Sequence, residues 1–384
     1  MKIVLSTIGK FSTFALARQL EQQDALEVIF TGYPKFKLKD EGLPMQKIHS
    51  FPWIQTSYLA LGRFGINNPW LSRELEWLSK QTFDTYVANN LPECHVFCGL
   101  SGSAFKTGKV AKNRGYGYVC ARGSSHIRYQ EAILREEYDI QGKPFDGIDT
   151  RVISKEEAEY ELADSIKVPS TFAKCSYIEM GIPQEKLWMV PYGVDLEKFY
   201  PVDQPSKEFF DILFVGSASF RKGIPYLLQA FSKLQHPHKR LTIVGTIQAE
   251  LTSILSKAAA EQNIITSGHI PQPQLKKIMS RSHVMVLPSI EDGFGAVLAQ
   301  AMACGCPVIS TTNTGAEDLF TDGVEGFIVP IRNADAITER LQLLADNPDL
   351  QQKMSRASLA QVKKIGGWDT YGSAMFNFFS RIKR

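Results

Sequence analysis

The chain has 384 residues, which is too long for one compact core and predicts two domains of ordinary size. Hydrophobic residues make up 44% and charged residues 22% of the sequence, and no apolar run reaches the roughly 20 residues that span a bilayer, so disordered, fibrous and membrane-embedded proteins are excluded. The net charge of +3 is uneven: residues 1–130 carry 16 Lys and Arg against 9 Asp and Glu, whereas residues 131–164 carry 4 against 11. The basic N-terminal excess fits an anionic ligand or membrane surface, and it fits ordinary solvated charge equally well.

The start of the chain lacks the long apolar core of a secretion signal, which predicts a cytoplasmic protein, with peripheral contact to the inner face of a membrane as an option. The six cysteines are therefore expected to stay reduced. Two close pairs occur, Cys94 with Cys98 and Cys304 with Cys306, but neither has the spacing of a zinc knuckle. No metal site is predicted.

The first half begins with a strand, a turn and a helix. Residues 2–7 predict a buried strand, Gly9 a turn, and residues 12–22 a helix with one apolar face. Residues 51–72 are rich in large apolar groups, which favours helices packed into the first domain over an exposed binding surface. Further strands are predicted at 27–30, 95–98 and 117–120.

The same arrangement recurs half a chain later, with a strand at 211–215, a turn at 216–223 and a helix at 224–234. Short apolar runs that alternate with helical segments are typical of parallel sheets covered on both faces. We therefore predict an α/β protein of two doubly wound, Rossmann-like domains that face a cleft. The domains are placed at 1–200 and 201–366, and the aromatic segment 367–384 is expected to form a helix that packs back toward the first domain or caps the second. Further strands are predicted at 240–244, 283–287, 307–310 and 326–329.

The strongest local signal is the segment 287–309, which predicts a strand, an acidic loop, a glycine turn, a helix and another strand. Carboxylates at Glu291 and Asp292 can accept hydrogen bonds from sugar hydroxyls. Gly293 and Gly295 let backbone N–H groups come close to a ligand, and the N-terminus of the following helix favours hydroxyl or phosphate oxygens. The pattern predicts a ligand site in this loop.

This segment closely resembles the donor-binding motif of the glycosyltransferases of family 4, in which a carboxylate, seven residues and a glutamate follow a Pro-Ser pair. Asp292 and Gln300 occupy the two acidic positions, and Phe294 stands in the glycine turn. Asp292 is one methylene shorter than the usual glutamate, so Glu291 can take over the sugar contact. Gln300 still offers an acceptor for the ribose hydroxyls, but without the assistance of a charge.

A second motif follows the strand at 211–215. In the family that it resembles, an arginine after the first glycine and a lysine before the second neutralise the diphosphate of the donor. Lys222 matches the lysine, whereas Ser217 follows Gly216 where the arginine would stand. Arg221 is then the natural substitute for the missing charge.

Two positions in the first half complete the predicted site. The resemblance implies a histidine near the transferred sugar, after the strand at 117–120, and His126 is the candidate, with a purely structural role as the alternative. Gly9, after the first strand, is the candidate for a contact with the donor. The predicted catalytic residues are His126, Arg221, Lys222 and Asp292, and the predicted donor-binding residues are Gly9, Gly216, Ser217, Glu291, Gly293, Phe294, Gly295 and Gln300.

The resemblance implies the GT-B architecture, with an acceptor-side first domain and a donor-binding second domain. It implies transfer of a sugar from a nucleoside-diphosphate sugar to a saccharide or glycolipid acceptor, with retention of configuration, without a metal or a cofactor, and without a nucleic-acid partner. A GT-B-like epimerase or phosphorylase and a noncatalytic sugar-nucleotide sensor or partner subunit are the alternatives. A dinucleotide oxidoreductase is disfavoured, because neither early turn has the full Gly-x-Gly-x-x-Gly pattern.

Overall fold

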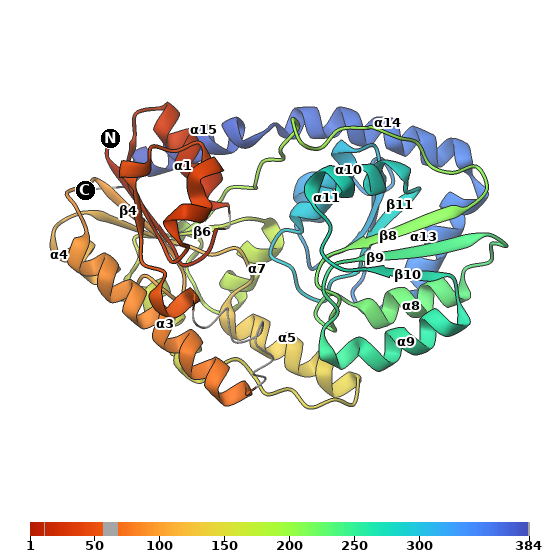
Figure 1. Cartoon of the computed structure of the whole chain (residues 1–384), viewed down its shortest axis with the longest axis horizontal. Helices are drawn as coiled ribbons and strands as arrows, with labels where there is room; N and C mark the ends of the chain where they lie inside the picture. The colour runs from red at the N-terminus through yellow and green to blue at the C-terminus, as the bar shows by residue number, and fades with distance from the viewer. Residues whose placement is uncertain (11, 57–67, 383–384) are drawn as a thin grey trace.

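The computed structural model describes residues 1–10, 12–56 and 68–382. Two α/β domains lie side by side, the first drawn in red to yellow and the second in green to blue (Figure 1). Each domain is a parallel sheet with helices on both faces, which confirms the predicted fold class. Of the apolar segment predicted at 51–72, the part at 57–67 lies outside the described residues.

The sheet of the first domain has seven parallel strands in the order β3-β2-β1-β4-β5-β6-β7. Its long central strands are fully or nearly fully buried apolar runs, as a sheet covered on both faces requires. The strands are β1 (Ile3–Thr7), β2 (Leu26–Thr31), β3 (Ile48–Ser50), β4 (Val96–Leu100), β5 (Gly117–Ala121), β6 (Ser165–Val168) and β7 (Leu187–Met189).

The sheet of the second domain has six parallel strands in the order β10-β9-β8-β11-β12-β13. The order of the first six strands is thus the same in both domains, and each sheet reverses its direction of winding beside its first strand. In open α/β sheets, ligands bind at the carboxyl ends of the strands near such a reversal. The strands are β8 (Phe210–Val215), β9 (Lys239–Val244), β10 (Ile264–Ser267), β11 (Val284–Leu287), β12 (Val308–Thr311) and β13 (Gly326–Val329).

The helices connect the strands and several begin at a polar residue that caps them. Asn68, Asp149, Ser170 and Asn333 each accept a hydrogen bond from a backbone N–H of the first turn, which satisfies a donor that the helix itself leaves unpaired. No helix in the described part of the chain is long and apolar enough to cross a membrane. The α-helices are α1 (Thr13–Gln22), α3 (Pro69–Asn90), α4 (Phe105–Asn113), α5 (Ile127–Ile140), α6 (Thr150–Leu162), α7 (Thr171–Glu179), α8 (Ile224–Lys233), α9 (Thr252–Glu261), α10 (Gln272–Arg281), α11 (Ala296–Ala303), α12 (Ala316–Leu319), α13 (Ala334–Asp346), α14 (Pro348–Ile365) and α15 (Trp368–Arg381). Short 3-10 helices occupy Lys35–Glu41, Met45–Lys47, Gln184–Lys186 and Ala249–Leu251.

The last helix, α15, belongs to the core of the first domain. Met375, Phe378 and Phe379 are buried in one apolar cluster with residues of β1 and α1. The ring of Phe378 stacks on Trp188, with ring centroids 4.8 Å apart. The chain therefore leaves the second domain through α14 and returns to the first, as Figure 1 shows at the top of the molecule.

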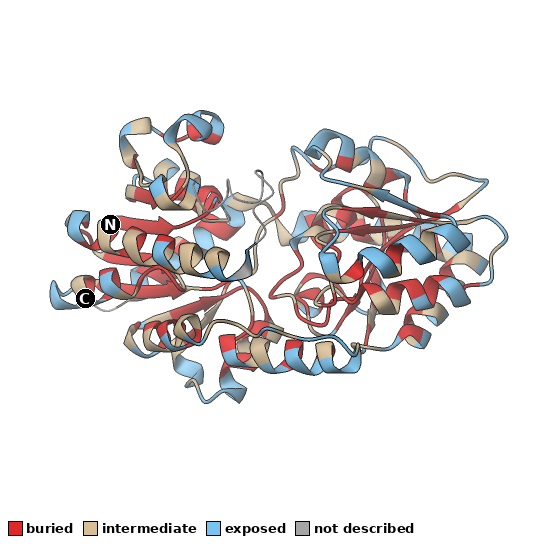
Figure 2. Ribbon diagram, turned by 60° about the horizontal axis from the view of Figure 1, so that its bottom comes forward, coloured by how far each residue is buried: buried red, intermediate tan, exposed pale blue. Residues whose placement is uncertain are grey.

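Two passages of chain join the domains, and they cross in direct contact. The N–H of Val194 donates to the carbonyl of Gly366 over 3.4 Å. A Cβ atom at Gly193 would lie only 2.2 Å from the carbonyl oxygen of Gly367, so a side chain does not fit at this crossing. Buried residues lie along the strands of both sheets, and exposed residues cover the outer sides of the helices (Figure 2).

Candidate active site in the interdomain cleft

A cleft of about 1760 Å³ lies between the domains. The first domain contributes residues that follow β1, β4 and β5, and the second contributes residues that follow β8 and β11. The carboxyl ends of both sheets therefore face the same space, which is where an open α/β sheet binds its ligands. Of the predicted site residues, Arg221 and Gln300 line this cleft.

Two adjacent loops of the second domain form its side of the site. One loop joins β8 to α8 and the other joins β11 to α11, and β8 and β11 are paired in the sheet. The loops are in close contact: the N–H of Ile290 donates to the carbonyl of Arg221 over 2.9 Å. Gly223 has a φ of +67°, and a Cβ there would lie 1.9 Å from the carbonyl oxygen of Pro288, so glycine is required. The fold thus brings the two predicted motifs into contact.

Glu291 is completely buried and joins both domains. Its carboxylate accepts hydrogen bonds from Ser124, Ser125 and Gln130 of the first domain, at 2.7 to 3.1 Å, and from Nε of Arg221 at 2.8 Å. Burial alone would raise the pKa of Glu291, but the Arg221 charge and these hydrogen bonds outweigh it and lower the pKa to about 2. With its acceptor sites used in this way, Glu291 does not offer the sugar contact that the sequence suggested.

Lys222 and Asp292 form the second pair between the two loops. The ammonium of Lys222 donates to one carboxylate oxygen of Asp292, and the other oxygen accepts from the N–H of Gly295 over 3.1 Å. Burial would raise the pKa of Asp292, but the charges of Lys222 and Arg221 outweigh it and lower the pKa. Both side chains are nearly one-fifth exposed, at 17% and 18%, although neither lines the cleft itself.

The glycine turn fits against the first domain. A Cβ at Gly293 would lie 2.1 Å from the carbonyl oxygen of Gly123, and the Gly293 carbonyl accepts from the Ser170 hydroxyl over 2.6 Å. The Phe294 ring packs edge-on against Tyr192, with centroids 5.2 Å apart. Gly295 has a φ of +72° and begins α11. These residues shape the loop and hold it against the first domain.

Gly216 and Ser217 lie beside the cleft, at the end of β8. Gly216 has a φ of +148°, and its N–H donates to the carbonyl of Val244 over 2.9 Å. The Ser217 hydroxyl accepts from the side-chain amide of Gln248 over 2.7 Å. Ser217 is therefore held by its own domain, and the positive charge of the site depends on Arg221 and Lys222.

His126 and Gly9 do not line the cleft, which differs from the roles predicted for them. His126 is 3% exposed and caps α5, where its Nδ1 accepts from the N–H of Arg128 over 3.2 Å. Its ring lies 5.1 Å from the rings of both Tyr160 and Tyr177, and burial lowers its pKa to about 4. Gly9 is also buried, and its carbonyl accepts from the Thr31 hydroxyl. His126 is a neutral residue that caps the start of α5. Its link to the site is indirect, because Gln130 on the same helix donates to Glu291.

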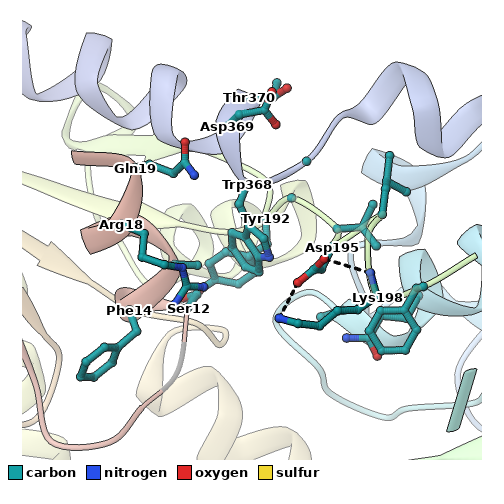
Figure 3. Close-up of a pocket in the computed structure, with 18 of the residues that line it drawn as sticks. Ser12, Phe14, Arg18, Gln19, Tyr192, Asp195, Lys198, Trp368, Asp369 and Thr370 are labelled. Carbon is teal, nitrogen blue, oxygen red and sulfur yellow. Dashed lines mark hydrogen bonds and ion pairs between the residues drawn. The ribbon is translucent and has the colours of Figure 1, made fainter. Parts of the chain in front are cut away.

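Several further residues line the cleft besides the predicted catalytic and donor-binding positions. Figure 3 shows the part of the cleft beside the crossing, where Arg18 extends from α1 toward Tyr192 and Trp368. Asp195 forms an ion pair with Lys198 over 2.7 Å on the opposite wall. Arg18, the segment that holds Tyr192 and Asp195, and Trp368 come from separate parts of the chain, and the fold brings them together. Within the described residues, no group of three or more His, Cys, Asp or Glu could hold a metal ion.

Comparison with known proteins agrees with this geometry. Residues 197–361 match the family model described as glycosyl transferases group 1. A D-inositol 3-phosphate glycosyltransferase from Xylanimonas cellulosilytica is 23% identical over 341 residues, which are 82% of this chain and 71% of the relative. The colanic acid biosynthesis glycosyltransferase WcaL from Escherichia coli, itself named as putative, is 27% identical over 193 residues, which are 47% of each chain. The chain thus spans only about half the length of most of the curated relatives it matches.

The similarity to solved structures extends over the whole chain. The sucrose-phosphate synthase from Thermosynechococcus elongatus superposes with a TM-score of 0.72 at 19% identity, over 99% of this chain and 98% of that one. HepE from Anabaena, in complex with UDP-glucose, superposes with a TM-score of 0.71 at 16% identity, over 99% of both chains. At these identities the similarity defines the fold. The chain therefore has the two-domain GT-B fold, and residues 197–361 of its second domain are similar to the group 1 glycosyl transferases.

Proposed function

We propose that the chain is a glycosyltransferase that moves a sugar from a nucleoside-diphosphate sugar to the hydroxyl group of an acceptor. The observation that carries this proposal is the pair of adjacent cations, Arg221 and Lys222, in the loop after β8, where the sheet reverses its winding beside the cleft. The match of residues 197–361 to group 1 glycosyltransferases supports it. HepE, which shares the fold, binds UDP-glucose, so a uridine diphosphate sugar is the first donor to test.

The two cations would hold the diphosphate of the donor. In the free protein each is paired with a carboxylate, Arg221 with Glu291 and Lys222 with Asp292. A diphosphate that reaches Lys222 releases Asp292, whose ionised carboxylate then accepts hydrogen bonds from sugar hydroxyls. Gln300 lines the cleft on α11 and is the candidate for the ribose contact. Glu291 keeps its buried bonds and orients Arg221.

We further propose transfer with retention of configuration and without a metal. The bond between the sugar and the diphosphate breaks first, and the electron pair goes to the leaving phosphate oxygen. The acceptor hydroxyl attacks from the same face and gives its proton to that oxygen, so the protein supplies no base. Arg221 and Lys222 stabilise the charge that develops on the diphosphate, by about 3 kcal/mol each if they act like other preorganised donors.

A direct experiment tests the proposal. Thermal shift with UDP-, GDP- and ADP-sugars identifies the donor, because a ligand that binds only the folded state raises its stability. Incubation of that donor with saccharide acceptors, followed by NMR of the anomeric proton, is expected to give a product with the donor's configuration, in the presence or absence of a chelator. Inverted product or loss of turnover with chelator would overturn the finer mechanism. Binding without turnover would instead favour a sugar-nucleotide sensor, and a changed donor without an acceptor would favour an epimerase or phosphorylase.

The acceptor is proposed to be a saccharide or a glycolipid, which would place the protein in polysaccharide or glycolipid biosynthesis. Lys10 and Arg18 line the first domain's side of the cleft, and both belong to the basic excess of residues 1–130. The large apolar side chains of Phe36, Trp53 and Trp70 are 69%, 73% and 69% exposed. Sedimentation with anionic lipid vesicles tests whether this domain also touches a membrane in the cytoplasm.

A further inference from the structure

A small pocket lies in the first domain beside the cleft. Its volume is about 30 Å³, and it lies at the carboxyl ends of β1, β4, β5 and β6, beside the start of α1. Ser12, Arg122, Gly123 and Tyr192 line both the pocket and the cleft, so the two spaces adjoin each other. Neither predicted motif of the donor site contributes to it.

Lys167 lies at the bottom of this pocket without an anionic partner. Its side chain is 1% exposed, and its ammonium nitrogen has no hydrogen-bond acceptor among the described residues. The nitrogen lies 3.8 Å from the ring centroid of Tyr192 and 5.2 Å from that of Tyr371. The neighbouring Cys98 thiol provides no negative charge, because burial raises its pKa to about 12. A buried ammonium in this setting is costly, and burial lowers the pKa of Lys167 to about 7.

Two further features of the pocket favour an anion: the Ser6 hydroxyl and the start of helix α1. The Ser6 hydroxyl has no partner in the part of the chain that the structure describes. Helix α1 has ten residues, and its N-cap Ser12 makes no side-chain hydrogen bond to the first turn. The positive end of that helix, where Ser12 and Thr13 line the pocket, therefore favours a negative charge. A buried cation, a free hydroxyl and a helix N-terminus all point to an anion.

We propose that this pocket binds the carboxylate of an acidic sugar, which serves as the acceptor. The volume has room for about two water-sized atoms, which suits the two oxygens of a carboxylate. A phosphate group, with its larger set of oxygens, and a sugar ring are both too large. The ring therefore lies in the cleft beside Arg122 and Gly123, next to Ser124, whose hydroxyl lies 3.3 Å from Arg221 of the donor loop. The identification of the sugar as an acceptor rests on the proposed function, whereas the carboxylate site itself does not.

The pocket is tested with D-glucuronate as the probe and D-glucose as its neutral counterpart. Isothermal titration is expected to show that glucuronate binds wild-type protein at least about tenfold more tightly than glucose, because a charge-assisted bond to Lys167 is available only to the carboxylate. Lys167→Met keeps an unbranched side chain that is one atom shorter and removes the charge, and it is expected to weaken glucuronate binding by about tenfold or more. Lys186→Met removes another partly buried lysine of the same domain, outside the pocket, and is expected to bind glucuronate like wild type.

Three results would overturn the proposal: equal affinity of wild type and Lys167→Met for glucuronate, equal affinity of wild type for glucuronate and glucose, or no saturable binding of glucuronate. If the methionine variant does not fold, wild-type protein labelled with 13C at the lysine Cε positions gives the answer. Glucuronate is then expected to shift one lysine signal, and a spectrum unchanged at saturation contradicts the site. UDP-sugar binding is measured separately, so failure of the donor site and failure of this pocket give different results.

Discussion

The Nε atom of Arg221 lies 2.8 Å from Oε2 of Glu291, and this bond ties the loop after β8 to a carboxylate that also holds the first domain. Ser124 and Ser125 donate to Oε1 of the same carboxylate, and Gln130 donates to Oε2 beside Arg221. Arg221, which is expected to bind the donor, is therefore positioned by Glu291, a residue that is hydrogen-bonded to both domains. Any movement of one domain relative to the other changes the position of Arg221.

Glu291→Gln is expected to reduce stability in a way that depends on pH. The pKa of Glu291 is lowered from its ordinary 4.5 to about 2, so the ionised form stabilises the fold above pH 4.5, and this contribution is lost as the pH falls toward 2. The full contribution is about 3 kcal/mol, of which roughly 2 kcal/mol disappears between pH 6 and pH 3. Urea denaturation of wild type and variant at both pH values measures the difference. An equal difference at pH 6 and pH 3 would contradict this role.

Lys222→Ala is expected to lower turnover by about 100-fold or more, because the alanine cannot stabilise the charge on the leaving diphosphate. The variant should still fold, since Asp292 keeps its bond to the N–H of Gly295, but the loss of its ammonium partner is expected to lower the melting temperature. Lys233→Ala is the matched control, because Lys233 pairs with Asp335 on the exposed surface of the same domain. The assay compares kcat and donor KM of both variants with wild type, and near-normal turnover of Lys222→Ala would remove its assigned role.

Gly293→Ala is expected to push the domains apart. The new Cβ would lie 2.1 Å from the carbonyl oxygen of Gly123 and 2.5 Å from Cα of Ser124, and these backbone atoms have no rotamer by which to move away. We expect a loss of about 1–3 kcal/mol in stability and a larger radius of gyration by small-angle X-ray scattering. Gly268→Ala is the control, because a Cβ there meets nothing within 4 Å. Identical scattering of both variants and wild type would show that the contact does not hold the domains together.

Phe378→Ala is expected to destabilise the first domain, although this residue lies near the end of the chain. Its side chain is 1% exposed and stacks on Trp188, so truncation should cost about 3–5 kcal/mol. Tryptophan fluorescence during urea denaturation reports the change. Phe36→Ala removes a phenylalanine that is 69% exposed and should change stability by no more than about 0.5 kcal/mol. Similar losses in the two variants would mean that α15 adds nothing to the core.

The sequence predicted the central part of both sheets, and it missed their weaker strands. Every strand that it predicted is present, because each is a continuous apolar run between turns. The strands β3 and β7 were missed because they have only three residues, and β6 and β10 were missed for other reasons. In β6 a lysine interrupts the apolar pattern, and β10 exposes Ile265 at the edge of its sheet.

In the candidate site, local motifs could be predicted from the sequence, whereas contacts between residues far apart in the chain could not. The loops around Arg221 and Glu291 were found because each carries its pattern within ten or so residues of chain. The hydrogen bond from Gln130 to Glu291 joins residues that are 161 positions apart, so no local pattern could reveal it. His126 was assigned from its position after a strand, but its burial depends on Tyr160 and Tyr177, which come from α6 and α7.

The return of α15 to the first domain has a consequence for how such proteins can be recombined. Residues of the first domain stand on both sides of the second in the chain, so the second domain is in effect an insertion with its two ends at the crossing of Gly193 and Gly367. A single crossover between two related genes would give a hybrid whose α15 comes from one parent and whose α1 comes from the other. Exchange of the donor-binding half therefore requires two crossovers, one at each end of the inserted segment, or a matched pair of α1 and α15 from the same parent.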